Sequence, residues 1–426
     1  MWRINGPSGF FTPDTAGYVG PAESLLHGSF TFLGLPEIFR TPGYPLLLVP
    51  AIAMKHVVVV TLLENHLLAT VSAWLVWRIT TDVFPGSRAA FWAVLLFSME
   101  PSGFLYSEKI ISETAFITFF LFFVSTLVRF LRQPRYAKLA VSAFALGCAT
   151  YIRPVPIYLA LWLVPVLLLF PDTLSLRQRL LRAIFFPVIF GLTLTPWIIR
   201  NNRVADYRAF SSTPDLDLYF YSAAAVQAKL EHKSFSQVQE ELGWFDRERY
   251  FQTHPEQRTW SQGRMARSCR AQASEIILSH LGSYLVIHAT GCARVVFNPG
   301  VTEFLMDVGQ YPASGGLIPS KLDQGLFRAT LWLFREYPLA AVALPLMAAQ
   351  LIFYYGLALA GMRRLPASVR SLFAAVALYY ILVSGIPGAV SRWRAPIMPL
   401  VCVCAGAAVA QWRVKESYVT ARATAT

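Results

Sequence analysis

Charged residues are scarce in this sequence. They make up 14% of the 426 residues, whereas hydrophobic residues make up 55%. Soluble domains typically carry about 25% charged residues, so a water-soluble fold of this length would lack the charge to cover its surface. The apolar content is also too high for a disordered chain. The composition therefore predicts an all-α protein with many membrane-spanning helices.

Cysteine is rare as well, with five residues in the chain. Cys148, Cys402 and Cys404 lie in apolar runs. Cys269 and Cys292 lie in a polar segment, where they would either form a disulfide or remain two free thiols. The sequence has no CxxC, HExxH, Walker A or GxSxG motif. It therefore contains no recognisable metal centre, phosphate-binding loop or serine nucleophile.

The basic residues give a net charge of +13, but their distribution does not indicate a nucleic-acid-binding surface. Short basic clusters alternate with apolar runs, as in residues 129–138 and 177–182. This pattern is typical of cytoplasmic loops in membrane proteins. We therefore expect a membrane, and no nucleic acid, as the partner of these charges.

Nine apolar stretches are expected to cross the membrane, because each is bounded by charged or turn residues. They cover residues 57–79, 89–105, 113–131, 138–152, 155–170, 183–199, 338–361, 368–386 and 395–412. Two further apolar stretches, 43–54 and 276–297, are expected to lie as helices at the membrane surface. The first is short and contains two prolines, and the second contains histidines and an arginine.

The orientation follows from the loops, because most basic residues of the short loops fall on one side, which is then cytoplasmic. The chain divides into an outer N-terminal loop with its surface helix, a transmembrane core, a large outer segment, the C-terminal spans and a cytoplasmic tail. These parts cover residues 1–56, 57–199, 200–337, 338–412 and 413–426. The outer side would be the extracytoplasmic face of the inner (plasma) membrane.

Five arginines lie on the outer side, against this charge bias. They are Arg40, Arg153, Arg200, Arg392 and Arg394. A guanidinium binds phosphate through two parallel hydrogen bonds and stays charged at any relevant pH. The set therefore predicts a site for a phosphate carried on a lipid. The alternative for each arginine is contact with lipid head groups or snorkelling at a helix end.

Two acidic residues on the same side are candidate partners of these arginines. Asp14 follows a proline in FTPDTAGY, and Glu113 opens a span in ISETAF. Each has a structural alternative, Asp14 as a turn residue and Glu113 as a helix N-terminal residue beside a capping Ser112. The functional hypothesis is that both carboxylates face a cavity at the outer membrane face.

An ordered set of motifs covers residues 10–200 and 380–412. It consists of FTPDTAGYVGPAESLLHGSF, PEIFRTPGYPLLL, EPSGFLYSEKIISETAF, YIRPVP, TPWIIRNN and SRWRAPIMP. This set resembles the GT-C glycosyltransferases, and more narrowly the branch with the protein O-mannosyltransferases and the lipid A aminoarabinose transferase (glycosyltransferase family 39). The resemblance implies a membrane enzyme that transfers a sugar from a polyprenyl-phosphate carrier to an acceptor outside the cytoplasm.

The resemblance also implies roles for single residues. Asp14 matches the family's catalytic acidic residue, Glu113 the second acidic position, and Arg40 the basic residue that meets the carrier phosphate. Tyr18 and Tyr44, in the same motifs, are expected to bind substrate together with the other outer arginines. The leaving phosphate needs cations, and the attacking hydroxyl needs a base. We expect Asp14 to be that base, in a displacement that inverts the anomeric centre.

Two departures from the family pattern limit these expectations. Residues 14–18 read DTAGY instead of a DExRY-like motif. This departure leaves the identity of the sugar open. It also leaves two alternatives for the cofactor, a bound divalent cation or none. The family has a span before this loop, whereas this sequence begins at Met1 without one. We therefore expect a shortened member or a start assigned too late.

Two other functions stay open at this point. An O-antigen ligase or polymerase would depend on the basic residues of the late outer loop and would have no essential Asp in the N-terminal segment. A transporter or flippase for a lipid-linked sugar would show inverted repeats and broken helices, and no repeat is visible in the sequence. The acceptor, whether a lipid, a glycan or a protein, would be selected by residues 200–337.

Overall fold

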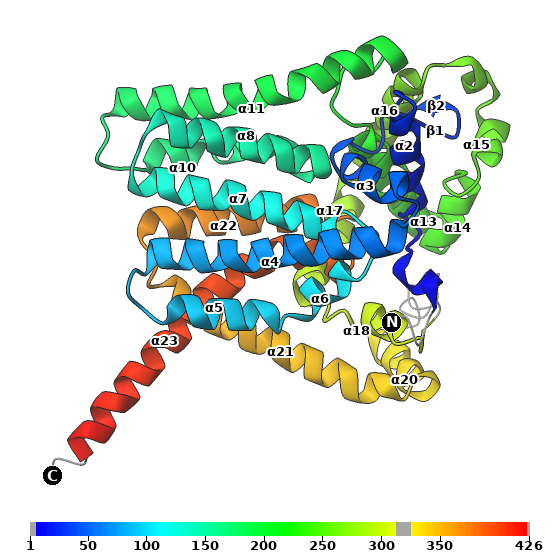
Figure 1. Cartoon of the computed structure of the whole chain (residues 1–426). Helices are drawn as coiled ribbons and strands as arrows, with labels where there is room; N and C mark the ends of the chain where they lie inside the picture. The colour runs from blue at the N-terminus through cyan, green and yellow to red at the C-terminus, as the bar shows by residue number, and fades with distance from the viewer. Residues whose placement is uncertain (1–5, 312–324, 424–426) are drawn as a thin grey trace.

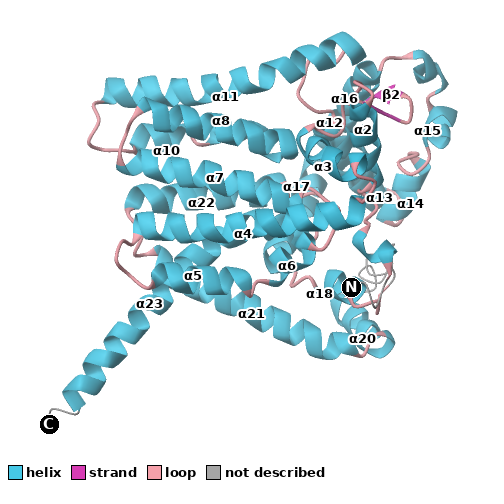
Figure 2. Ribbon diagram, viewed as in Figure 1, coloured by secondary structure: helices cyan, strands magenta, loops and turns pink. Residues whose placement is uncertain are grey.

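The computed structural model describes residues 6–311 and 325–423, and within them the protein is all-α (Figures 1 and 2). Only β1 (Thr31–Phe32) and β2 (Leu35–Pro36) form strands in these residues, as one antiparallel pair. Five helices here are long and apolar enough to cross a membrane. They are α4 (Val57–Val83), α7 (Glu113–Arg132), α11 (Leu176–Ala205), α21 (Leu339–Met362) and the stretch Ser391–Gln411. The predicted polytopic membrane fold is confirmed.

The other four predicted spans are shorter or interrupted. Helices α8 (Tyr136–Ile152) and α22 (Ala367–Val383) have 17 residues each, fewer than the ~20 of an upright span. The stretch 89–105 divides into α5 (Ala89–Ser98) and α6 (Pro101–Ser107). Glu100 causes the division, because its Oε2 caps α6 by accepting a hydrogen bond from Gly103 N at 3.0 Å.

The stretch 155–170 is also interrupted, into η2 (Val155–Tyr158), α9 (Leu159–Trp162) and α10 (Val164–Leu169). Pro154 precedes η2, Pro156 lies within it, and Pro165 is the second residue of α10. Each proline removes a backbone donor and so disturbs regular helical hydrogen bonding. The single straight span expected here is therefore replaced by three short helical pieces.

The stretch 276–297 is not a single helix at the surface. Helices α16 (Gln262–Ser279) and α17 (Leu281–Phe297) meet at a bend of 103°. Helix α17 packs against α22 and η5 (Ser391–Ile397). The approach is close, since a Cβ on Gly291 would lie 2.2 Å from the carbonyl oxygen of Gly385. The helix therefore contacts the bundle, and with α16 it could form one broken span.

The centre of the bundle is α7. It packs against α4, α8 and α22, and the rings of Phe116, Phe120 and Phe123 on it are fully buried. At the other end of the chain, α23 (Met398–Ala423) packs against α5 and α21. It runs past residue 412 into the predicted tail, of which residues 424–426 lie outside the described residues.

Both predicted outer segments lie at the same end of the bundle. Figure 1 shows α2, α3 and α13–α16 at this end, and the end of α23 at the opposite one. The helix expected over 43–54 is α3, which packs against α2, α4 and α8. The remaining elements are η1 (Pro7–Phe10), α2 (Ala16–Leu26), α3 (Gly43–Ala53), α12 (Thr213–Asp217), η3 (Leu218–Ala223), α13 (Ala224–Leu230), α14 (Phe235–Glu241), α15 (Arg247–Thr253), η4 (Pro255–Thr259), α18 (Val301–Asp307) and α20 (Leu326–Glu336).

Candidate active site

Asp14 lies between two arginines from opposite ends of the chain. Its Oδ1 accepts a hydrogen bond from Arg40 Nη2 at 2.6 Å, and its Oδ2 accepts one from Arg392 Nη1 at 2.8 Å. Asp14 precedes α2, whereas Arg392 lies in the first turn of η5, 378 positions away. Folding thus brings the N-terminal loop and the turn before the last helix into one site.

Glu113 forms the second half of the same site. As the first residue of α7 it is 2% exposed, accepts a hydrogen bond from Arg153 Nη1, and lies 3.2 Å from Arg392 Nε. Arg392 therefore bridges two carboxylates. We call Asp14, Arg40, Glu113, Arg153 and Arg392 the ion cluster. With both acids ionised, three guanidiniums and two carboxylates leave it a net charge of +1.

The N-terminal loop is held against the residues that precede α7. Thr15 Oγ1 donates a hydrogen bond to Ile110 O at 3.0 Å, and Ile110 N donates one to Phe10 O at 2.9 Å. The hydroxyl of Tyr18 lies 3.0 Å from Ser112 Oγ. Ser112 binds this tyrosine and makes no side-chain capping bond to α7. These contacts fix Asp14 beside Glu113.

Arg40 is positioned by the loop that leads into α3. Glu37 Oε1 accepts hydrogen bonds from Phe39 N at 2.6 Å and from Arg40 N at 2.8 Å, which closes a turn. Burial raises the pKa of the Glu37 carboxyl, although these bonds oppose the shift. A Cβ on Gly43 would lie 2.6 Å from the carbonyl oxygen of Tyr151. Glycine thus lets α3 approach the end of α8, close to the position of Arg153.

Two tyrosines predicted to bind substrate lie beside Arg40. The Tyr18 hydroxyl accepts a hydrogen bond from Arg40 Nη1 at 3.0 Å, and the guanidinium lies 4.6 Å from the centre of the Tyr18 ring. The rings of Tyr18 and Tyr44 meet edge to face at 4.9 Å. The buried Tyr44 hydroxyl has no hydrogen-bond partner within residues 6–311 and 325–423. It could therefore donate to a bound ligand.

Arg200 does not belong to the ion cluster. Its Nη2 donates to Phe30 O at 2.7 Å, and its Nη1 donates to Glu37 O and to Asn201 Oδ1. Its guanidinium also lies 4.8 Å from the centre of the Trp197 ring. The observed contacts of Arg200 therefore support the backbone of the loop that carries Arg40.

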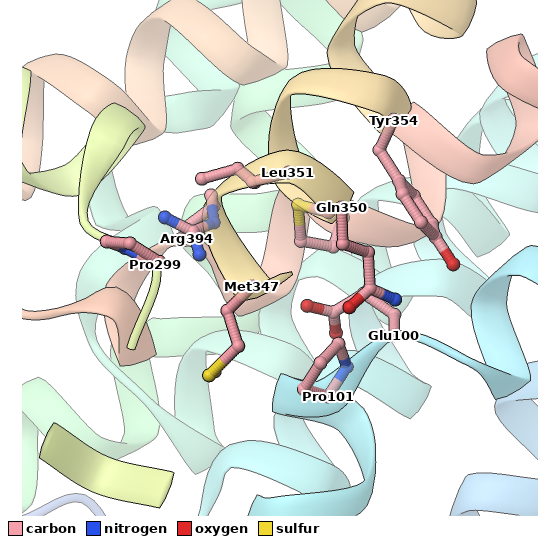
Figure 3. Close-up of a pocket in the computed structure, with 9 residues that line it drawn as sticks. Glu100, Pro101, Pro299, Met347, Gln350, Leu351, Tyr354 and Arg394 are labelled. Carbon is pink, nitrogen blue, oxygen red and sulfur yellow. The ribbon is translucent and has the colours of Figure 1, made fainter. Parts of the chain in front are cut away.

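Arg394 is likewise engaged elsewhere. It is 2% exposed, and its Nη1 donates to the carbonyl oxygens of Val295, Val296 and Asn298 at the end of α17. Figure 3 shows Arg394 beside a cavity of about 20 Å³ that is also lined by Glu100. This volume holds about one water molecule, so the cavity is too small for a sugar.

The electrostatics of Asp14 are dominated by its two arginines. Burial raises the pKa of the Asp14 carboxyl, but Arg392 and Arg40 together lower it by more, so the pKa lies well below its usual range. Asp14 is therefore ionised at physiological pH. A carboxylate with so low a pKa is a strong partner for cations and a weak base.

The same residues do not fit a metal ion well. Within residues 6–311 and 325–423, no group of three or more His, Cys, Asp or Glu side chains is arranged to hold one. Asp14 and Glu113 already bind guanidiniums, and the surrounding positive charges oppose a dication. The cluster fits an anion better than the divalent cation that the sequence left open.

The cysteines contribute no covalent link. All five are free thiols. Cys269 Sγ lies 3.5 Å from Tyr250 OH, whereas Cys292 Sγ donates to Ile381 O at 3.4 Å. Of the two alternatives for Cys269 and Cys292, the structure shows two free thiols.

One part of the site was not predicted from the sequence. Asp217 ends α12, and Tyr221 lies in the π-helical turn η3 that follows. Burial is the largest cause that raises the pKa of Tyr221 to about 12. The charges of Asp217 and Asp14 add to this shift, and those of Arg392 and Arg40 oppose it. These charges place Tyr221 near the ion cluster. A π-helical turn has no hydrophobic period that a sequence pattern would reveal.

Comparison with known proteins identifies relatives of the fold. Residues 42–199 match the family described as dolichyl-phosphate-mannose-protein mannosyltransferase. The archaeal oligosaccharyltransferase AglB from Archaeoglobus fulgidus, solved with an inhibitory peptide and a dolichol-phosphate, matches 98% of this chain with a TM-score of 0.53 and 14% identity. The chain has the GT-C fold. The fold that the ordered motifs implied is therefore confirmed.

The similarity to AglB is one of fold. This chain covers 48% of the AglB chain. ArnT from Cupriavidus metallidurans matches in the apo state with a TM-score of 0.37 and 12% identity, over 93% of this chain and 72% of that one. The same protein bound to undecaprenyl phosphate matches with a TM-score of 0.36 and 13% identity, over 94% of this chain and 73% of that one. No curated protein sequence matches the chain.

Proposed function

We propose that this GT-C protein is an integral membrane glycosyltransferase of the inner (plasma) membrane. It would move a sugar from a polyprenyl-phosphate donor to an acceptor hydroxyl on the extracytoplasmic side. The ion cluster carries this proposal, because it places a net positive charge and two carboxylates at one end of an apolar bundle. AglB, which has a similar fold, was solved with a dolichol-phosphate.

The donor phosphate would bind at Arg392 and Arg153. Their Nη2 atoms have no hydrogen-bond partner in the described part of the chain, so both remain available to phosphate oxygens. Arg40 uses Nη1 for Tyr18 and Nη2 for Asp14, and would contribute mainly through its charge. Arg200 and Arg394 would then support the site through the backbone contacts described above.

The chemistry would be a displacement at the anomeric carbon. The bond between C1 and the phosphate oxygen breaks through an oxocarbenium-like state, and the leaving polyprenyl phosphate gains a second negative charge. Guanidiniums aimed at that oxygen stabilise the developing charge. Attack by the acceptor hydroxyl from the opposite face would invert the anomeric centre. The sequence predicts Asp14 as the base for this hydroxyl, but the arginines that lower its pKa make it a weak base. Glu113 as a ligand of the acceptor or the sugar hydroxyls stays a prediction.

The acceptor would be a lipid, a glycan or a protein. In the outer segment, the residue before α12 contacts the loop that carries Arg40, since Ser212 N donates a hydrogen bond to Ile38 O at 2.9 Å. An acceptor bound at the cluster would therefore lie close to this part of the outer segment. This supports a role of residues 200–337 in acceptor choice.

The test is sugar transfer by the purified protein in vesicles. The donors are polyprenyl phosphates that carry radiolabelled hexoses or pentoses, and the readout is release of polyprenyl phosphate together with a labelled product. Arg392→Gln should lose about 10²-fold or more, since removal of one transition-state donor costs about 10²–10³-fold. The matched control is Arg249→Gln, at a partly exposed arginine of the outer segment that pairs with Glu240, and it should keep wild-type activity.

Other outcomes would support the alternative functions. Transfer from polyprenyl diphosphate donors alone would indicate a ligase or polymerase. Movement of intact donor across the vesicle membrane, without cleavage, would indicate a flippase. Sidedness is tested with inside-out and right-side-out vesicles, because only one orientation should use donor added from outside.

A further inference from the structure

Asp217 is a carboxylate near the ion cluster that the mechanism above does not use. It is the last residue of α12 and is partly exposed. Its side chain makes no hydrogen bond or ion pair within residues 6–311 and 325–423, in contrast to Asp14, which binds two guanidiniums. Both oxygens of Asp217 therefore keep lone pairs free for a substrate hydroxyl.

The position of Asp217 is fixed from the start of its helix. Thr213 Oγ1 and Ser211 Oγ both donate to Phe39 O at 2.7 Å, and Phe39 precedes Arg40. Residues four apart lie on the same side of a helix, about 6 Å from each other. Asp217 therefore lies one turn beyond Thr213, on the helix side that contacts the Arg40 loop.

The position is also fixed from the end of the same segment. The Tyr221 ring packs against the Trp244 ring at 5.5 Å, and the Trp244 ring packs against the Phe39 ring at 6.3 Å. A Cβ on Gly388 would have Tyr221 as a neighbour at 3.8 Å, so η3 also approaches the turn that leads to Arg392. The segment 213–221 thus packs against both the loop that carries Arg40 and the turn that leads to Arg392.

We propose that Asp217 is the group that accepts the proton of the attacking hydroxyl, while Asp14 holds the arginines at the donor phosphate. This assignment rests on the transferase function proposed above. The acceptor oxygen forms the new bond to C1, its proton passes to a carboxylate oxygen of Asp217, and the C1–O bond electrons leave with the phosphate. The polyprenyl phosphate departs as a dianion, and Asp217 later releases its proton to water.

The charge environment of Asp217 suits this role. Burial raises the pKa of the Asp217 carboxyl to about 7, with Arg40 lowering it and Asp14 raising it. These are the charged groups that act on it. The nearby Asp215 is directed away, toward Tyr207 and Arg270, and α17 brings no charge that acts on Asp217. A base is most effective when its pKa lies near the working pH, which holds for Asp217 and not for Asp14.

The experiment compares transfer rate against pH for the wild type, Asp217→Asn and the control Asp246→Asn. Asp246 lies in the same outer segment and caps α15 by accepting from Glu248 N at 2.9 Å, a bond that asparagine preserves. We expect wild-type and control rates to rise through about pH 7. Asp217→Asn should be slower by about 10²–10⁴-fold and should lose this rise. Binding of polyprenyl phosphate, measured separately, should be unchanged in all three.

Three outcomes would refute the role of Asp217 as the base and would leave the proposed transferase function unaffected. They are a wild-type rate in Asp217→Asn, an unchanged pH rise in that variant, and loss of polyprenyl phosphate binding, which would indicate a structural role. No transfer by the wild type from any polyprenyl phosphate donor would refute the function itself. An independent check is carbodiimide labelling of Asp217, which requires the protonated acid. The extent of labelling should decrease as the pH rises, with a midpoint near pH 7. Labelling that is already absent at pH 5 would contradict the proposal.

Discussion

Replacing Asp14 with asparagine should separate donor binding from sugar transfer. The change keeps the size of the side chain and one acceptor oxygen, but it removes the negative charge that Arg40 and Arg392 share at 2.6 and 2.8 Å. Each charge-assisted hydrogen bond contributes about 1.5–3 kcal/mol. If both guanidiniums lose their alignment with the leaving phosphate, the loss is about 3–6 kcal/mol, or about 10²–10⁴ in rate at 1.4 kcal/mol per factor of ten.

The effect on donor binding should have the opposite sign. Asp14 lies beside the site proposed for the phosphate, and its carboxylate repels that anion. Two unit charges about 5 Å apart interact by about 3 kcal/mol at an effective dielectric constant of about 20, and part of this is lost because the Asp14 side chain is 29% exposed. Asp14→Asn raises the charge of the cluster from +1 to +2. Polyprenyl phosphate should therefore bind no more weakly than to the wild type.

The assays are equilibrium binding of polyprenyl phosphate to protein in detergent, and transfer from a labelled polyprenyl phosphate sugar. Thermal unfolding of the same samples reports stability, and Asp246→Asn again serves as the control. We expect a modest loss of stability, because two partly exposed guanidiniums lose their partner. Transfer at the wild-type rate would refute the reasoning. Loss of binding at unchanged stability would refute it as well, because the carboxylate would then help to hold the donor.

Further substitutions test other parts of the site. Arg40→Ala should weaken donor use by about tenfold or more, and Arg40→Lys by less, because lysine keeps the charge but not the paired hydrogen bonds. Glu113→Gln should give a milder loss of transfer that varies with the acceptor, measured with two or more acceptors. In a background without the native cysteines, Arg132→Cys should react with an impermeant thiol reagent only from the cytoplasmic side and His232→Cys only from outside. Labelling of His232→Cys from the cytoplasm would invert the proposed orientation.

The fold could be predicted largely from composition and apolar runs. All nine predicted stretches are helical in the structure. Four of them are shorter or more interrupted than a regular membrane span, and the sequence did not predict this. The sequence does not show that Glu100 caps a new helix through Gly103 N, or that prolines divide residues 155–170 into three pieces. These interruptions depend on single hydrogen bonds and prolines inside apolar runs. The hydropathy pattern does not indicate where a helix ends within such a run.

The candidate site was predicted in part. Charge bias alone selected the arginines on the outer side, and the structure joins Arg40, Arg153 and Arg392 to the acids. It directs Arg200 and Arg394 to backbone carbonyl oxygens instead. Sequence position cannot make this distinction, because all five residues have the same charge and lie on the predicted outer side. The difference arises from tertiary contacts that only the folded chain contains.

The geometry of Asp14 bears on the choice between the proposed function and its alternatives. A ligase would use basic residues of the late outer loop and would have no essential Asp near the N-terminus. Here the late arginine, Arg392, is bound to the early acid, Asp14, at 2.8 Å, so the two cannot serve separate sites. A flippase must release its contacts on one side in each cycle, whereas Arg392 joins α7, η5 and the N-terminal loop through both carboxylates. A bridge of this kind holds the charges in place before the reaction. Charges held in place stabilise a transition state, whereas transport requires the contacts with the substrate to change. The ion cluster therefore supports catalysis over transport.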